Sequence, residues 1–279
     1  MIFHKQYKGG KMLQSNLNEL YVKIPNTLPL DEELSNKAVA IYYYIAECAT
    51  LGNYAVVSLR NLLKQFGYKN VDRYYSQYIL ALEELEEEGY IEIFNEEFKL
   101  INAMKITKDD ILYINLEGRE YEYFSAYIGD VHNIMRNSKT NHVKQREDII
   151  RYYLVIQRWT NYKDFGDQPK EAEHGRRIAY YTATQANREV GIDASTFKKY
   201  NGLLQELKIF YYDNSYRTSD LKNLPTKFVR CRMWTEQEFR ERIDYLAKDK
   251  NQKKYDKEAA NIRRSNTQKR NYAKRKRIA

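Results

Sequence analysis

Residues 190–210, VGIDASTFKKYNGLLQELKIF, carry the pattern that decides the fold. Gly191 can end one helix, and Ser195 can cap the next. After Ser195 apolar residues return at helical spacing and the positions between them are polar. Two helices joined by a short turn, with one face of the second buried, predict a helix-turn-helix unit. Its outward, groove-reading residues are predicted to be Ser195, Thr196, Lys198, Lys199 and Asn201.

The flanking sequence completes this unit. Thr182 or Thr184 can cap the short helix that Gly191 ends. The remaining elements are expected at residues 148–159 (helix), 178–181 (extended), 209–212 (strand) and 228–233 (strand). This is the element order of a winged helix-turn-helix domain, which we assign to residues 145–234.

The same order occurs earlier in the chain. Ser58 can cap a helix that Gly67 ends, and Gly89 closes a third helix. The expected elements are a helix over 34–51, an extended segment over 55–57, helices over 59–66 and 70–88, and a hairpin of residues 90–93 and 98–101. The outward residues of the third helix are predicted to be Asn70, Arg73, Tyr74 and Gln77.

We therefore expect a mainly α fold with small β wings (α+β), built from two tandem winged-helix domains. The first occupies residues 30–136 and ends in a connector with a strand at 111–116, an extended stretch at 121–127 and a short helix at 130–136. The other segments are 1–29 (N-terminal segment), 137–144 (linker) and 235–279 (C-terminal helix and basic tail).

Positive charge is concentrated at the C-terminus. Residues 240–279 hold 15 Lys or Arg and 5 Asp or Glu, a net +10, so the rest of the chain carries −1 of the total +9. Such a tail favours phosphate contact, and we expect it to be frayed or helical only on DNA. A solubilising or RNA-binding tail is the alternative. The tail residues predicted to bind DNA are Arg263, Arg264, Lys274, Arg275, Lys276 and Arg277.

Two other charged segments have two interpretations each. The polar loop 213–227 can lie on the DNA backbone or in the minor groove, through Arg217, Lys222 and Lys227, or can be a plain surface loop. The acids between Glu83 and Glu97 must face away from phosphate, or form a docking surface for a basic partner.

Other functional classes lack their signatures. Cys48 and Cys231 are too few for a disulfide framework or a four-cysteine metal site. No run of about 18 apolar residues and no signal-peptide pattern occurs, so we expect a cytoplasmic protein that needs no membrane. No P-loop or Rossmann glycine pattern occurs. The four histidines, His4, His132, His142 and His174, include neither a pair at i and i+4 nor a His-x-His pair, the spacings typical of metal sites. We expect no catalysis, no metal and no cofactor.

With both units laid out, the chain resembles the tandem winged-helix replication initiators of plasmids and phages from low-GC Gram-positive bacteria. The resemblance spans roughly residues 30–235 and rests on SLRNLL (58–63), EEEGYIEI (86–93), Thr184-Gln185-Ala186 and the stretch 190–210. It implies binding to origin repeats and recruitment of host helicase machinery. The acidic first wing and the long basic tail do not map onto that family.

Three functions follow as hypotheses. The first is sequence-specific binding of double-stranded DNA at a replication origin, with the second domain as main reader. The second is a transcriptional regulator of the same fold. The third is a protein-interaction adaptor, such as a helicase loader, that uses the acidic surface. A homodimer could form through the aromatic-rich helix at Ile41 to Ile45, although a buried core helix explains that segment better.

Overall fold

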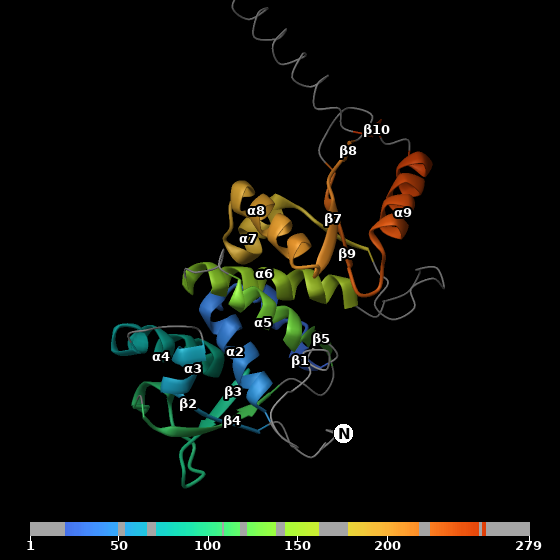
Figure 1. The fold of residues 1–279 in the computed structure, drawn as a ribbon. Helices are drawn as coiled ribbons and strands as arrows, with labels where there is room; N and C mark the ends of the chain where they lie inside the picture. The colour runs from blue at the N-terminus through green and yellow to red at the C-terminus, as the bar shows by residue number, and fades with distance from the viewer. Residues whose placement is uncertain are drawn as a thin grey trace, which may run out of the picture.

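The computed structural model describes residues 20–49, 54–65, 71–107, 109–117, 122–137, 143–161, 178–217, 224–250 and 253–254. Within these ranges the protein is α+β, with eight α-helices, two short 3-10 helices and small antiparallel sheets. Two groups of elements make up most of it (Figure 1).

The first module is a helix, a strand, two helices and two strands. These are α2 (Asn36–Cys48), β2 (Tyr54–Ser58), α3 (Leu59–Gln65), α4 (Val71–Glu87), β3 (Ile91–Phe94) and β4 (Ile111–Leu116), with the 3-10 helix η2 (Ala103–Lys105) before β4. The antiparallel sheet has the order β2-β4-β3. Alternation places Ala55, Ile114 and Ile93 in register on the buried face.

The second module repeats this order. It contains α6 (Val143–Asn161), β6 (Ala179–Tyr181), α7 (Ala183–Val190), α8 (Ala194–Glu206), β7 (Phe210–Asp213), β8 (Tyr216–Arg217) and β9 (Thr226–Arg230). Its sheet has the order β6-β9-β7, so the last strand is again central. The chain therefore builds the same topology twice.

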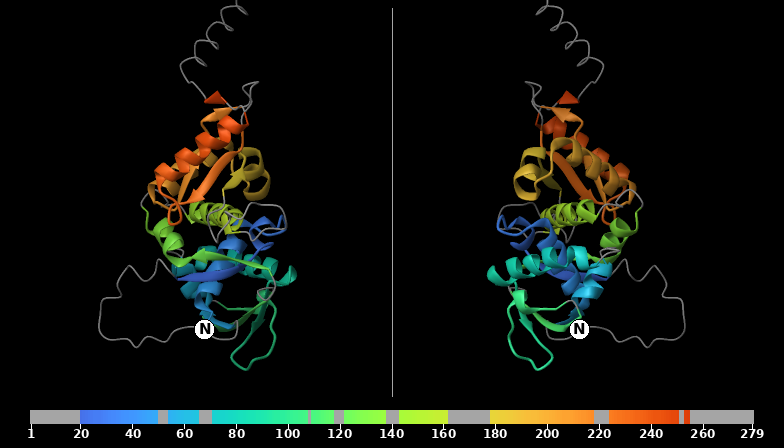
Figure 2. Two further views of the ribbon diagram at one scale, coloured as in Figure 1. Left: turned by 90° about the vertical axis from the view of Figure 1, so that its right-hand side faces the viewer. Right: turned by 90° about the vertical axis from the view of Figure 1, so that its left-hand side faces the viewer.

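Two further groups of elements complete the fold. The connector strand β5 (Tyr123–Tyr127) pairs with β1 (Tyr21–Pro25), which precedes the 3-10 helix η1 (Leu28–Leu30), and α5 (Ile128–Arg136) follows β5. The C-terminal helix α9 (Glu236–Asp249) packs on the outer face of the second sheet through Phe239, Ile243 and Ala247. Figure 2 shows α9 on the outer side of that sheet.

A single hydrophobic cluster runs through both modules. It extends from Val22 to Phe228 and includes nine buried residues of α2. In Figure 1, α6 lies across the middle of the molecule with α2 below it and α7 and α8 above it. Because α2 packs against both α4 and α6, Ile41 and Ile45 are fully buried, as expected for a core helix.

A buried arginine also joins the modules. Arg151 of α6 donates from Nε to the carbonyl of Pro29 at 3.1 Å and from Nη2 to that of Asp31 at 2.6 Å. Its Nη1 donates to the carbonyl of Leu34 at 2.5 Å and to Oδ1 of Asn36 at 3.1 Å. Burial lowers the pKa of Arg151, and these acceptors satisfy the guanidinium without a carboxylate.

Several elements differ from the expectations. Residues 98–101 turn back against β3 as the expected hairpin requires, with an antiparallel bridge at Phe94 and Leu100 and a hydrogen bond from Ile101 N to Ile93 O at 2.9 Å. They form no regular strand, however, and the main partner of β3 is β4. The segment 1–29 contains the strand β1. The tail segment Lys253–Lys254 forms a strand, β10, that pairs with β8, although we expected it to be frayed.

Candidate nucleic-acid interface

The helix pair α7 and α8 is defined by strong local signals. Thr182 and Gln185 form a reciprocal capping box at the start of α7. Gly191 ends that helix at φ 72°, a left-handed conformation that glycine adopts without a Cβ penalty. Only Ile192 and Asp193 separate Gly191 from α8, so the two helices are held close together.

Asp193, and not Ser195, caps α8. Its carboxylate accepts from the backbone N–H of Thr196 at 2.7 Å and from the hydroxyl of Ser195 at 2.7 Å. These hydrogen bonds lower the pKa of the exposed Asp193. Asp and Ser are both favourable N-cap residues, so the sequence alone did not distinguish Asp193 from Ser195, and we predicted Ser195. The consequence is a fixed negative charge at the positive end of the helix dipole.

The outward face of α8 is polar and cationic. Ser195, Lys198 and Lys199 are exposed, and Thr196 is half-buried. Neither lysine has a hydrogen-bond or ion-pair partner among the described residues. Two neighbouring cations on a solvent-facing helix, unneutralised by the described part of the chain, suit a polyanionic ligand.

Asn201, which we predicted to read DNA, points inward. It is 2% exposed, and its Oδ1 accepts a hydrogen bond from the hydroxyl of Tyr152 in α6. It follows Phe197 by four residues, and in an α-helix that spacing places both on one face. Asn201 therefore fixes α8 against α6 and is removed from the candidate interface.

The inner side of α8 is anchored by aromatic rings. The Tyr152 ring lies 5.7 Å from that of Phe197 and 6.0 Å from that of Tyr200. Phe197 also meets the edge of Phe228 on β9 at 6.5 Å. Such packing restricts helix rotation, so the exposed lysines are presented in one orientation.

The first module places its predicted residues differently. On α4, Gln77 is exposed and accepts from Lys37 Nζ at 2.6 Å, while Tyr74 is half-buried. Arg73 lies in the first turn of α4 with its side chain outside the described atoms, and Asn70 lies outside the described residues. The two described side chains, Tyr74 and Gln77, are both uncharged.

Some of the acids at Glu83 to Glu97 have structural partners. Glu84 Oε2 accepts from the backbone N–H of Ser35 at 2.8 Å, just before α2. Glu86 Oε2 accepts from the backbone N–H of Ala103 at 3.1 Å in η2. These carboxylates satisfy helix-terminal N–H groups, a role that the clustering of acids in the sequence does not reveal.

Two of the three predicted wing residues, Arg217 and Lys227, are described, and both lie in strands. Lys227 is in β9, 4% exposed and 4.0 Å from Asp213 Oδ2, and burial lowers its pKa. It is a buried strand residue and not a DNA contact. Arg217, half-buried in β8, donates to the carbonyls of Asn214 and Tyr216. Lys222 lies outside the described residues. So do the predicted tail contacts Arg263, Arg264, Lys274, Arg275, Lys276 and Arg277.

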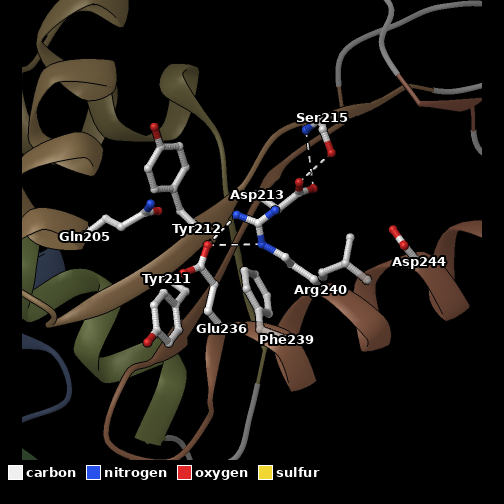
Figure 3. Close-up of a pocket in the computed structure, with 10 residues that line it drawn as sticks. Gln205, Tyr211, Tyr212, Asp213, Ser215, Glu236, Phe239, Arg240 and Asp244 are labelled. Atoms are coloured by element: carbon white, nitrogen blue, oxygen red, sulfur yellow. Dashed lines mark hydrogen bonds and ion pairs between the residues drawn. The ribbon is translucent and has the colours of Figure 1, made fainter.

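A hollow of about 320 Å³ lies between α9 and β7 (Figure 3). Its charged groups are engaged by their neighbours: Arg240 pairs with Glu236, and Asp213 accepts from Ser215. Because these charges are satisfied locally, the hollow offers a polyanion less than the α8 face does. α8 therefore remains the stronger candidate site.

Within the described residues, no group of three or more His, Cys, Asp or Glu could hold a metal ion. No helix among them is long and apolar enough to cross a membrane. Comparison of the chain with protein-family models and with curated proteins finds no match.

Proposed function

We propose that the protein binds double-stranded DNA in a sequence-specific manner through the α7–α8 pair of its second module. The observation that carries this proposal is the pair Lys198 and Lys199, exposed and without a described partner on a helix whose other face is locked to the core. A rigid helix with a free polar face matches what insertion into a major groove requires.

The repeated topology supports a finer description of the fold. In each module two helices follow a short strand, and two later strands join it in one antiparallel sheet; in the second module β8 lies outside this sheet. This order and sheet connectivity agree with a winged helix-turn-helix, with α4 and α8 as the third helices. We propose two tandem winged-helix modules.

Among DNA-binding roles we favour a replication initiator of a plasmid or phage that acts in the bacterial cytoplasm, because the sequence resembles that class. A transcriptional regulator would use the same helix. DNase footprinting on the replicon that encodes the protein separates the two roles: protection of iterated origin repeats supports an initiator, whereas protection confined to a promoter supports a regulator.

The first module favours a second role, in protein interaction. Leu80 on α4 is 50% exposed, and Glu87 and Glu88, about two helical turns further along the chain, are exposed acids. The acids repel phosphate, and together with the exposed Leu80 they suit a basic protein partner such as a helicase or its loader. Loss of helicase binding in Leu80→Glu and Glu87→Lys, with DNA binding retained, is the expected result for this adaptor role.

Fluorescence anisotropy with DNA fragments from the encoding replicon tests the main proposal. At near-physiological salt we expect one fragment to bind at least about 1000-fold more tightly than random duplex. Lys198→Ala and Lys199→Ala should each weaken binding and reduce the dependence of log K on log salt by about one.

Lys64→Ala is the matched control, because Lys64 is exposed on α3 of the first module. Its DNA affinity should equal that of the wild type. Equal losses in all three lysine variants would mean that net charge, and not the α8 face, determines binding. Equal affinity for all duplexes would contradict sequence specificity.

A further inference from the structure

Gly202 occupies an unusual place in α8. It is exposed in the interior of a 13-residue helix, and its backbone is not in the left-handed region. A Cβ built on Gly202 would have no atom within 4 Å. Neither backbone conformation nor packing within the described chain therefore requires glycine at this position.

Glycine has a cost here. In a helix interior it is less favourable than alanine, because the unfolded chain is more flexible at glycine and the helix gains no side chain. An exposed, unconstrained helical glycine is thus explained best by something outside the chain that approaches the helix backbone closely. Close backbone approach to a ligand is one of the established uses of glycine.

The neighbours of Gly202 indicate what approaches. Lys199 and Lys198 precede it by three and four residues, and Ser195 by seven, so all lie on the same side of α8. Both lysines are exposed and have no partner among the described residues. A surface without a side chain, bordered by free cations, fits a polyanion in van der Waals contact with the helix.

The internal repeat shows that glycine is not inherent to this position. Ile209 N donates to Leu204 O at 2.9 Å after α8, and Tyr90 N donates to Leu85 O at 2.9 Å after α4. Aligning these two matching bonds places Gly202 opposite Glu83. The equivalent helix of the first module thus carries a charged, partly exposed side chain at this position.

The start of α8 is less suited to phosphate. The Asp193 carboxylate already accepts the Thr196 N–H and the Ser195 hydroxyl, and it adds a negative charge there. An anion approaching the helix N-terminus would meet this carboxylate first. The favourable contact zone is therefore displaced along the helix, towards Lys198, Lys199 and Gly202.

We infer that α8 meets double-stranded DNA at its middle, with Gly202 as the point of closest approach between the helix backbone and the duplex. This inference rests on the proposed function. It differs from insertion of the helix N-terminus, which would leave Gly202 outside the contact and indifferent to substitution.

The test compares Gly202→Ala with wild type on the tightest short duplex that the wild-type protein selects from a random pool. We expect the melting temperature to rise by about 2 °C, since alanine favours the helix. DNA affinity should fall about tenfold, since a methyl group now separates the surfaces. The salt dependence should stay that of the wild type, because no charge is lost.

Glu83→Ala on α4 is the matched control, at the equivalent position of the first module, and its DNA affinity should not change. Unchanged affinity in a stabilised Gly202→Ala would overturn the inference. A lowered melting temperature would do so as well, because it would assign Gly202 a structural role. If the wild type selects no duplex from the pool, the proposed function fails instead.

Discussion

The hydroxyl of Tyr152 in α6 donates a hydrogen bond to the side-chain oxygen of Asn201 in α8. Both residues are almost fully buried, Tyr152 at 0% and Asn201 at 2% exposure. A polar pair between two helices of a hydrophobic interior specifies one helix orientation, because any rotation leaves two buried polar groups without partners.

Asn201→Leu should therefore lower the free energy of unfolding by about 1–3 kcal/mol, since the Tyr152 hydroxyl loses its partner. Tyr152→Phe should have a similar effect, and the double variant should cost less than the two single changes together. Urea unfolding measures all three. If Asn201→Leu kept the stability of the wild type but lost DNA selectivity, Asn201 would contact DNA and not hold α8 to α6.

Replacing Arg151 should destabilise the whole fold. In Arg151→Met the carbonyls of Pro29, Asp31 and Leu34 lose their donor at the junction of the modules. We expect a loss of about 3–5 kcal/mol, in the range of severe core changes. Arg240→Met is the control: Arg240 and its ion-pair partner Glu236, four residues apart on α9, are both exposed, so the loss should stay within about 0.5 kcal/mol. Comparable losses in both variants would contradict the special role of Arg151.

Breaking the pair Asp130 and Arg232 should make stability depend more strongly on pH than it does in the wild type. Burial raises the pKa of Asp130, opposed by Arg232, whose Nη2 lies 2.6 Å from Asp130 Oδ1. In Arg232→Met that opposition is lost and the pKa rises further. A carboxyl with a raised folded pKa binds its proton more tightly in the native state, so stability falls as pH rises through the window between unfolded and folded pKa.

Unfolding of Arg232→Met, measured from pH 4 to pH 8, should show this decline. The double variant Asp130→Asn with Arg232→Met should lack it, because its amide does not titrate. A decline of the same size in the double variant would assign the pH effect to another group.

The helix ends after α4 and α8 allow a matched pair of substitutions with opposite signs. Gly89 and Lys208 occupy equivalent positions, and both are left-handed, at φ 70° and φ 55°. Lys208→Gly should stabilise the protein by about 1 kcal/mol, because the Cβ penalty disappears. Gly89→Ala should destabilise it by a similar amount. Thermal unfolding measures both, and shifts of the same sign would contradict the equivalence.

Truncation after Lys250 should weaken DNA binding and flatten its salt dependence, because most of the basic tail is removed. The preference of the protein for one duplex over another should remain, since phosphate contacts carry little sequence information. Anisotropy titrations at several salt concentrations measure both quantities. Loss of the preference together with the tail would place base reading outside α8.

Local signals predicted much of the fold. The cap at Thr182, one of the two threonines expected there, the breaks at Gly89 and Gly191, and the strand at residues 111–116 agree with the structure, because each depends on neighbouring residues alone. The pairing of β1 with β5 joins segments about 100 residues apart and has no local signature.

The site was predicted less well, for reasons visible at single residues. Asn201 shares a helix face with Phe197, so its spacing indicated burial, but its polarity suggested a contact. Lys227 sits beside Phe228 at the start of β9, and its charge made a strand resemble a loop. The exposure of Gly202 follows from its helical position, whereas its open surroundings are evident only in three dimensions.

The hydrophobic cluster that α2 and α6 share also limits how the chain can be divided. A cut between Asn137 and Val143 would leave complementary apolar helices on separate fragments, and each fragment alone should expose a large apolar surface. When the two fragments are expressed together, they should associate through α2 and α6 and restore the fold. By the same reasoning, recombination with a foreign gene could replace one module only if it replaced the other module as well.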